Sequence, residues 1–155
     1  GIAGQKAPKL DVNTWFNLPA GKKRAEITDH KGGVLMLFFF QSWCPGCHSR
    51  GFPTLQAVQK HFSGASDVGF LAVQTVFEGF GTNTAKRAKR EADKIGLKIP
   101  VGHDAGPGNT GSRVMRRYRS GGTPWIVIVD KEGVVKYNAF HIRPRQAISL
   151  IQSLR

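Results

Sequence analysis

Cysteine is scarce in this sequence, and the only two residues, Cys44 and Cys47, lie in one short stretch. A framework of structural disulfides is therefore excluded, and cysteine usage alone does not assign the protein to a compartment. Long apolar runs are also missing. The longest, from Val34 to Phe40, is far shorter than the roughly 20 residues that a membrane-spanning helix needs.

Acidic residues are few, with 10 Asp and Glu against 23 Lys and Arg, and the net charge is +13. Such a surplus occurs in proteins that bind nucleic acid, anionic membranes or acidic partners. No nucleic-acid-binding motif accompanies the charge, so we expect a basic solvated surface and no nucleic acid partner. Two basic segments, residues 86–94 and 113–119, precede Thr123 and Pro124 and predict a positive rim around that position.

Repeats, low-complexity tracts and interdomain linkers are absent from the 155 residues. A hydrophobic content of 40% is ordinary for a chain that buries one core. We therefore expect a single domain over residues 1–155, with its core between residues 11 and 154, and a monomer. The chain starts at Gly1 without Met, which is compatible with a signal peptide or membrane anchor removed from upstream.

What the sequence does contain is a short cysteine motif between a strand and a helix. The run Val34–Phe40 predicts a strand buried on both faces. Apolar residues at helical spacing follow the motif and predict a helix over residues 47–62, kinked at Pro53. The first sulfur would lie at the helix N-terminus, where N–H groups and the dipole stabilise a thiolate. Two intervening residues let both sulfurs join, as in a dithiol that exchanges its disulfide with another protein.

The remaining pattern predicts alternating strands and helices. Strands are expected over residues 12–18, 25–27, 68–76, 99–101, 125–129 and 134–140. Helices are expected over residues 85–95, 112–119 and from Pro144 to the C-terminus. Thr84 or Asn83 could cap the first of these helices, and Gly96 ends it.

The sequence Trp43–Cys44–Pro45–Gly46–Cys47 between strand and helix, with Gly122–Thr123–Pro124 before a later strand, resembles the thioredoxin superfamily. Within it, the chain is similar to the extracytoplasmic reductases of the TlpA and ResA kind. The resemblance implies an α/β thioredoxin fold, with a central mixed sheet flanked by helices. It also implies an N-terminal β-hairpin and a central insert over residues 77–111.

The resemblance also implies a thiol–disulfide oxidoreductase with Cys44 as nucleophile and Cys47 as resolving thiol. A cis Pro124 would face the dithiol, and an extended substrate would bind along Thr123. Substrate contacts are expected from Trp43, Pro45, Gly46, Thr123 and Pro124. We expect a reductase of protein disulfides in the periplasm or another extracytoplasmic compartment. It would be served by an upstream thiol reductant and would need no cofactor or metal.

Three positions depart from the family pattern. The buried Asp of thioredoxin, six residues before the first cysteine, is replaced by Phe38, and the Glu of ResA-type proteins by Arg50. The helix proline also comes one residue late, at Pro53. Candidates for acid–base work or for tuning the thiol pKa are therefore Glu78, His48 and Arg50.

Other functions stay open on the sequence alone. The Cys44–His48 stretch matches the C-x-x-C-H haem attachment pattern, although a buried strand leading into it is foreign to c-type cytochromes. A peroxiredoxin-like peroxidase would need Thr and Pro where Gln41 and Leu37 stand. A binding module for an anionic partner, with little redox activity, is the alternative from another class. His103, Asp104 and His141 do not have zinc-site spacing.

Overall fold

The computed structural model describes residues 2–155, which form a six-stranded sheet in the order β1-β4-β3-β2-β5-β6. The strands are β1 (Thr14–Phe16), β2 (Val34–Phe40), β3 (Val68–Thr75), β4 (Val101–Asp104), β5 (Trp125–Val129) and β6 (Val135–Ala139). Strands β2, β3 and β4 are mutually parallel, whereas β1, β5 and β6 each run antiparallel to a neighbour. The sheet is therefore mixed, as predicted.

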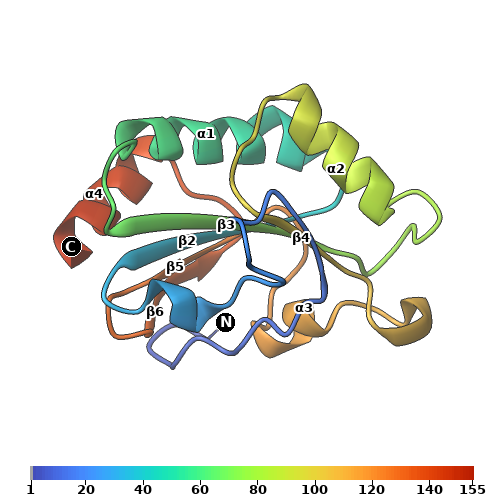
Figure 1. The fold of residues 1–155 in the computed structure, drawn as a ribbon, viewed down its shortest axis with the longest axis horizontal. Coiled ribbons are helices and arrows are strands. Elements are labelled where there is room, and N and C mark those ends of the chain that lie inside the picture. The colour runs from blue at the N-terminus through green and yellow to red at the C-terminus, as the bar shows by residue number, and fades with distance from the viewer. Residues whose placement is uncertain (1) are drawn as a thin grey trace.

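Strand β2 is the centre of the protein, and all of its side chains are buried. Because successive side chains point to opposite faces, Phe38 and Phe40 enter one apolar cluster while Leu37 and Phe39 enter the other. Helices α1, α2 and α4 cover the first face, and α3 with the N-terminal segment covers the second (Figure 1). These helices are α1 (Phe52–His61), α2 (Ala85–Lys94), α3 (Arg113–Arg117) and α4 (Pro144–Leu154). No helix within residues 2–155 is long and apolar enough to cross a bilayer.

The predicted N-terminal hairpin is wrong. Strand β1 pairs with β4, and the segment predicted as its partner leads instead into a 3₁₀ turn, Ile27–His30. The Glu26 carboxylate accepts hydrogen bonds from the backbone N–H groups of Leu10 and Asp11, at 2.6 and 2.9 Å. The Glu26 side chain thus ties this segment to the chain just before β1 without a strand pair.

The segment over residues 77–111 contains α2, β4 and a short 3₁₀ turn, Pro107–Asn109. Thr84 caps α2 through its hydroxyl, which accepts from the Arg87 N–H at 3.2 Å. Strand β4 begins at Val101, two residues later than predicted. Pro100 has no N–H to donate, and its carbonyl accepts from Ala72, so the ladder starts only after it.

The helix after the cysteines is irregular at its start and not at Pro53. Residues Cys47–Gly51 form a π turn, closed by the Phe52 N–H donating to the Cys47 carbonyl. Pro53 lies in the first turn of α1, directly after the π turn, in a helical segment that continues from Pro45. A π turn holds one residue more than an α turn, which accounts for the proline coming one position late.

Candidate functional site

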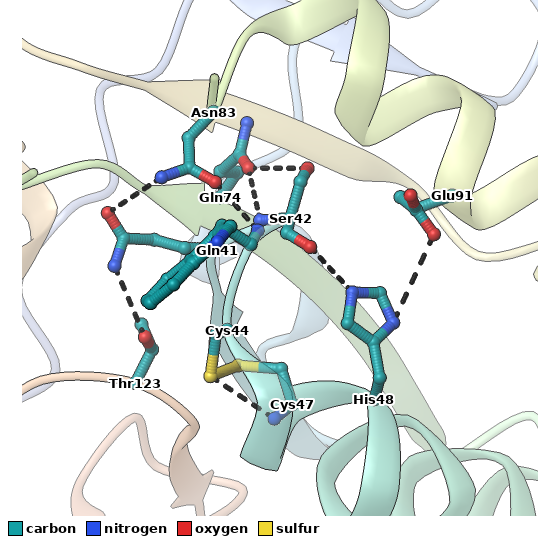
Figure 2. The surroundings of a disulfide bond; sticks show 10 residues. Gln41, Ser42, Cys44, Cys47, His48, Gln74, Asn83, Glu91 and Thr123 are labelled. Atoms are coloured by element: carbon teal, nitrogen blue, oxygen red, sulfur yellow. Dashed lines mark hydrogen bonds and ion pairs between the residues drawn. A yellow bond between two sulfur atoms is a disulfide. The ribbon is translucent and has the colours of Figure 1, made fainter. Parts of the chain in front are cut away.

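The two cysteines lie where β2 ends and the helical segment begins, and they are joined in a disulfide with their Cα atoms 5.3 Å apart (Figure 2). The Cys47 backbone N–H points at the Cys44 Sγ, at 3.2 Å. Cys47 is fully buried, whereas Cys44 is 8% exposed and follows Trp43, which is 61% exposed. Of the two cysteines, only Cys44 keeps any exposed surface.

Pro124 packs directly on the cysteine motif. The Thr123–Pro124 peptide bond is cis. A methyl group on Gly46 would lie 3.4 Å from the Pro124 Cδ, and one on Gly51 would lie 3.2 Å from its Cβ. The Gly51 position would also place that methyl 2.6 Å from the Phe38 ring, so a side chain there would clash. Glycine at position 51 thus lets the π turn pack against both Pro124 and the Phe38 ring of the core.

An amide network that the sequence did not reveal holds the loop before Cys44. The Ser42 N–H and hydroxyl both donate to the Gln74 Oε1, each at 2.7 Å. The Asn83 Oδ1 accepts from the Trp43 N–H at 2.8 Å, and its Nδ2 donates to the Glu78 carbonyl at 3.0 Å.

Gln41 connects this network to Thr123, the residue before Pro124. Its Oε1 accepts from the backbone N–H of Phe77, and its Nε2 donates to the Thr123 Oγ1 at 3.4 Å (Figure 2). The side chains of Gln41, Gln74 and Asn83 are all at most 2% exposed. The signal that could have revealed this network is the position of Gln41 and Gln74 at the carboxyl ends of neighbouring parallel strands, where the sites of open α/β sheets lie.

Replacing Asn83 with Ala should destabilise the protein by about 1–3 kcal/mol, because the Trp43 N–H and the Glu78 carbonyl would lose the hydrogen bonds that the buried Asn83 side chain makes to them. Urea unfolding measures the loss. Asn83→Asp is the matched variant, because it keeps the oxygen that accepts from the Trp43 N–H. It should shift the tryptophan less than the Ala variant does. An Ala variant within about 0.5 kcal/mol of wild type would show that the network does not hold this loop.

The three candidates for acid–base work lie in different settings. The His48 Nε2 lies 2.6 Å from the Ser42 carbonyl, so this nitrogen carries the proton, and Nδ1 faces the Glu91 carboxylate at 4.0 Å. Arg50 is exposed on the π turn. Glu78 contributes its backbone to the network, while its carboxylate is exposed and makes no ion pair or hydrogen bond within residues 2–155.

Burial lowers the pKa of His103 below its ordinary value of 6.5, against a smaller opposing effect of Asp104. The Gln74 Nε2 lies 3.0 Å from the His103 Nδ1, so the neutral imidazole accepts this hydrogen bond. Burial also lowers the pKa of His30. Both imidazoles stay neutral in the folded protein at pH values where the unfolded chain already binds protons.

The stability that the two neutral histidines contribute should therefore be fully present above pH 6.5. It should be lost as the pH falls toward their folded-state pKa values. Denaturant unfolding between pH 7.5 and about pH 5 measures this, above the range where most carboxylates titrate. His103→Gln retains an acceptor for Gln74, and the unfolding free energy of this variant should depend less steeply on pH. An equal slope in wild type and variant would assign the effect to other groups.

Large apolar side chains are exposed around the same loop. Trp43, Phe77 and Phe140 are 61%, 36% and 43% exposed, and within residues 2–155 they are three of the four large apolar residues that face solvent. Phe77 and Phe140 both lie against Gly122, just before Thr123. Such clustering is typical of a surface that binds another protein.

Metal chemistry finds no support in the described residues. His103, Asp104 and His141 do not assemble, and no group of three or more His, Cys, Asp or Glu within residues 2–155 could hold a metal ion. The burial of Cys47 and the engagement of His48 with Ser42 also leave the C-x-x-C-H pattern without the free sulfurs and free imidazole that haem attachment needs.

Comparison with known proteins places this site in a family. The redoxin family model matches residues 2–149. A thioredoxin-like superfamily protein of known structure is 30% identical with a TM-score of 0.88, over 97% of this chain and 96% of the other. A thiol-disulfide isomerase from Corynebacterium glutamicum is 31% identical with a TM-score of 0.80, over 96% of each chain.

A candidate thiol:disulfide interchange protein DsbE from Chlorobium tepidum shares the fold at 23% identity and a TM-score of 0.71, over 97% of this chain and 93% of that one. No curated protein matches the chain. The family match spans nearly all of the sequence, including both cysteines and Pro124, and the sheet order supports it. The chain therefore belongs to the redoxin family and has the thioredoxin-like fold.

Proposed function

We propose that this protein is a thiol–disulfide oxidoreductase that reduces disulfides of protein partners through Cys44 and Cys47. The observation that carries the proposal is the asymmetry of the two sulfurs. Cys44 is accessible and receives the Cys47 N–H at the start of a helix, whereas Cys47 is buried. The N–H and the helix dipole stabilise negative charge on the Cys44 sulfur once the disulfide is reduced.

In the reaction, the Cys44 thiolate attacks one sulfur of the partner disulfide, and the other partner sulfur leaves as a thiolate. The Cys47 thiolate then attacks the Cys44 Sγ, which forms the intramolecular disulfide and releases the second partner thiolate. Two electrons pass from the protein to its partner, and protons from water neutralise the thiolates. An upstream thiol reductant must reduce the disulfide again, and no other cofactor enters the sequence of steps.

The exposed Trp43, Phe77 and Phe140 support polypeptide substrates. They surround the loop that ends in Thr123 and Pro124, where an extended chain can pair with the backbone. Pro45 and Gly46, in the motif itself, complete the proposed substrate contacts. His48 and Arg50 are proposed to favour the thiolate by their charge, and Glu78 is proposed as an acid–base group at the exposed edge.

An extracytoplasmic, TlpA-like role as a single-domain monomer over residues 1–155 is part of the same proposal. It rests on the motif and on the likeness to proteins described as thiol–disulfide isomerase and interchange proteins. Turbidity of insulin on reduction, with dithiothreitol as reductant, tests the activity. Titration against glutathione gives the reduction potential of the Cys44–Cys47 pair. Insulin reduction no faster than with dithiothreitol alone would refute the proposal.

A further inference from the structure

A groove of about 420 Å³ lies beside the π turn, between the start of α1 and the segment that leads into α4. Its floor contains Ile126 and Ile142, which are only 2% and 9% exposed. Arg50 from the π turn and His141 and Arg143 from the other wall supply its basic groups, and Ser49, Thr54 and Gln146 add neutral polar ones. The groove thus combines an apolar floor with basic walls.

The groove is continuous with the cysteine site. Arg50 lies three residues after Cys47 on the same π turn, and Gly51 both lines the groove and approaches Pro124. On the other wall, His141 directly follows Phe140, which lies against Gly121 and Gly122. A polypeptide with its cysteine at Cys44 would therefore reach the groove within a few residues.

The charge of the groove is uncompensated. No carboxylate lines it, and Arg50 and Arg143 form no ion pair with any of the residues described. Both side chains are exposed. Guanidinium groups bind carboxylates with two parallel hydrogen bonds, so a pair of them across an apolar floor suits a segment that carries acidic and apolar side chains.

The arginines that the sequence singled out are engaged elsewhere. Arg116 donates to the carbonyls of Thr110 and Gly111, and Arg117 donates to the Leu10 carbonyl and pairs with Asp11. These two side chains hold loops of their own chain. Arg50 and Arg143 are basic groups outside residues 86–94 and 113–119, on which the prediction of a positive rim is based.

We propose that this groove binds an acidic, partly apolar segment of the disulfide-bearing partner protein, and that Arg50 and Arg143 thereby select acidic protein substrates. The inference rests on the proposed oxidoreductase function and names its substrate class. Because the groove is exposed, the charge should act mainly on the rate of association and should weaken with salt.

The kinetic test uses two synthetic peptides, each disulfide-linked to a small thiol, with Asp and Glu beside the cysteine in one and Asn and Gln in the other. Reduced wild-type protein should react with the acidic peptide about tenfold faster at low ionic strength, and the preference should largely vanish at about 0.5 M salt. The double variant Arg50→Gln/Arg143→Gln should lose the preference. The rate with uncharged bis(2-hydroxyethyl) disulfide reports the effect of Arg50 on the Cys44 thiolate, so the preference is taken as the ratio of the two peptide rates within each form. Arg143→Gln alone should already weaken this ratio.

The matched control is Lys86→Gln/Arg90→Gln, which removes two exposed charges from α2 and lowers the net charge equally. It should keep the preference for the acidic peptide. If this control loses the preference to the same extent, or the groove variant retains it, the charge acts diffusely and the groove proposal is wrong.

Binding without chemistry separates this inference from the proposed function. A fluorescent acidic peptide with Ser in place of cysteine should bind wild type more tightly than the groove variant, as measured by anisotropy. If wild type fails to reduce bis(2-hydroxyethyl) disulfide, the proposed oxidoreductase function is wrong. The anisotropy measurement still tests whether the groove binds an acidic segment. An oligonucleotide that binds more tightly than the acidic peptide, and does so through Arg50 and Arg143, would overturn the choice of partner.

Discussion

Insulin reduction is expected to fall to the uncatalysed rate when Cys44 is replaced by Ser, because the attacking sulfur is then gone. Cys47→Ser should also stop turnover but should retain the first step, since Cys44 can still attack a partner disulfide. Without Cys47 the mixed disulfide is not resolved. The Cys47→Ser variant should therefore accumulate covalent adducts that non-reducing gels and mass spectrometry detect, whereas Cys44→Ser should not.

Alkylation gives an independent measurement of the same roles. With 8% exposure against full burial, Cys44 should react first with iodoacetamide when the reduced protein is treated at neutral pH. Peptide mapping locates the label, and thermal unfolding of both Ser variants checks that each is folded. Preferential labelling of Cys47, or adducts in the Cys44→Ser variant, would reverse the assignment of nucleophile and resolving thiol.

Phe38→Ala is expected to destabilise the protein by about 3–5 kcal/mol, the range for removing a fully buried aromatic ring. The Phe38 ring lies 5.9 Å from the Phe40 ring in a stacked arrangement and 4.9 Å from the Phe52 ring in an edge contact. It also supports Gly51 in the π turn. The loss should appear in urea unfolding as a lower midpoint with an unchanged slope.

Two further variants at this position separate volume from polarity. Phe38→Leu keeps most of the apolar volume and should lose less stability than the Ala variant. Phe38→Asp restores the acid found in thioredoxin at this place, but here the carboxyl would lie among aromatic rings and lack a partner. It should therefore unfold at least as readily as the Ala variant. An Asp variant as stable as wild type would show that the site tolerates a buried acid.

The resemblance of the Trp43–Cys47 stretch and of Thr123–Pro124 to the thioredoxin superfamily implied the general fold, whereas the sequence by itself determined the central strand and the position of both cysteines. These features depend on local signals: an unbroken apolar run, a helical spacing after it and the turn chemistry around Pro45. The strand pair after Pro124 followed from equally local patterns, which also narrowed the helix cap to Thr84 or Asn83; the structure shows that it is Thr84. Each involves residues close together along the chain, so a pattern of side-chain types is enough to predict it.

Tertiary structure decided the partner of β1, the π turn and the surroundings of the cysteines. Residues 25–27 seemed a natural partner for β1 by proximity, but pairing depends on which edge of the sheet is free, and β4 offers that edge. The contacts of Gln41 with Thr123 and of Asn83 with Trp43 join segments far apart in sequence. The same holds for the placement of Arg50 and Arg143 along one groove. Such contacts arise only when the packed sheet brings distant loops to one end, and no local sequence pattern predicts them.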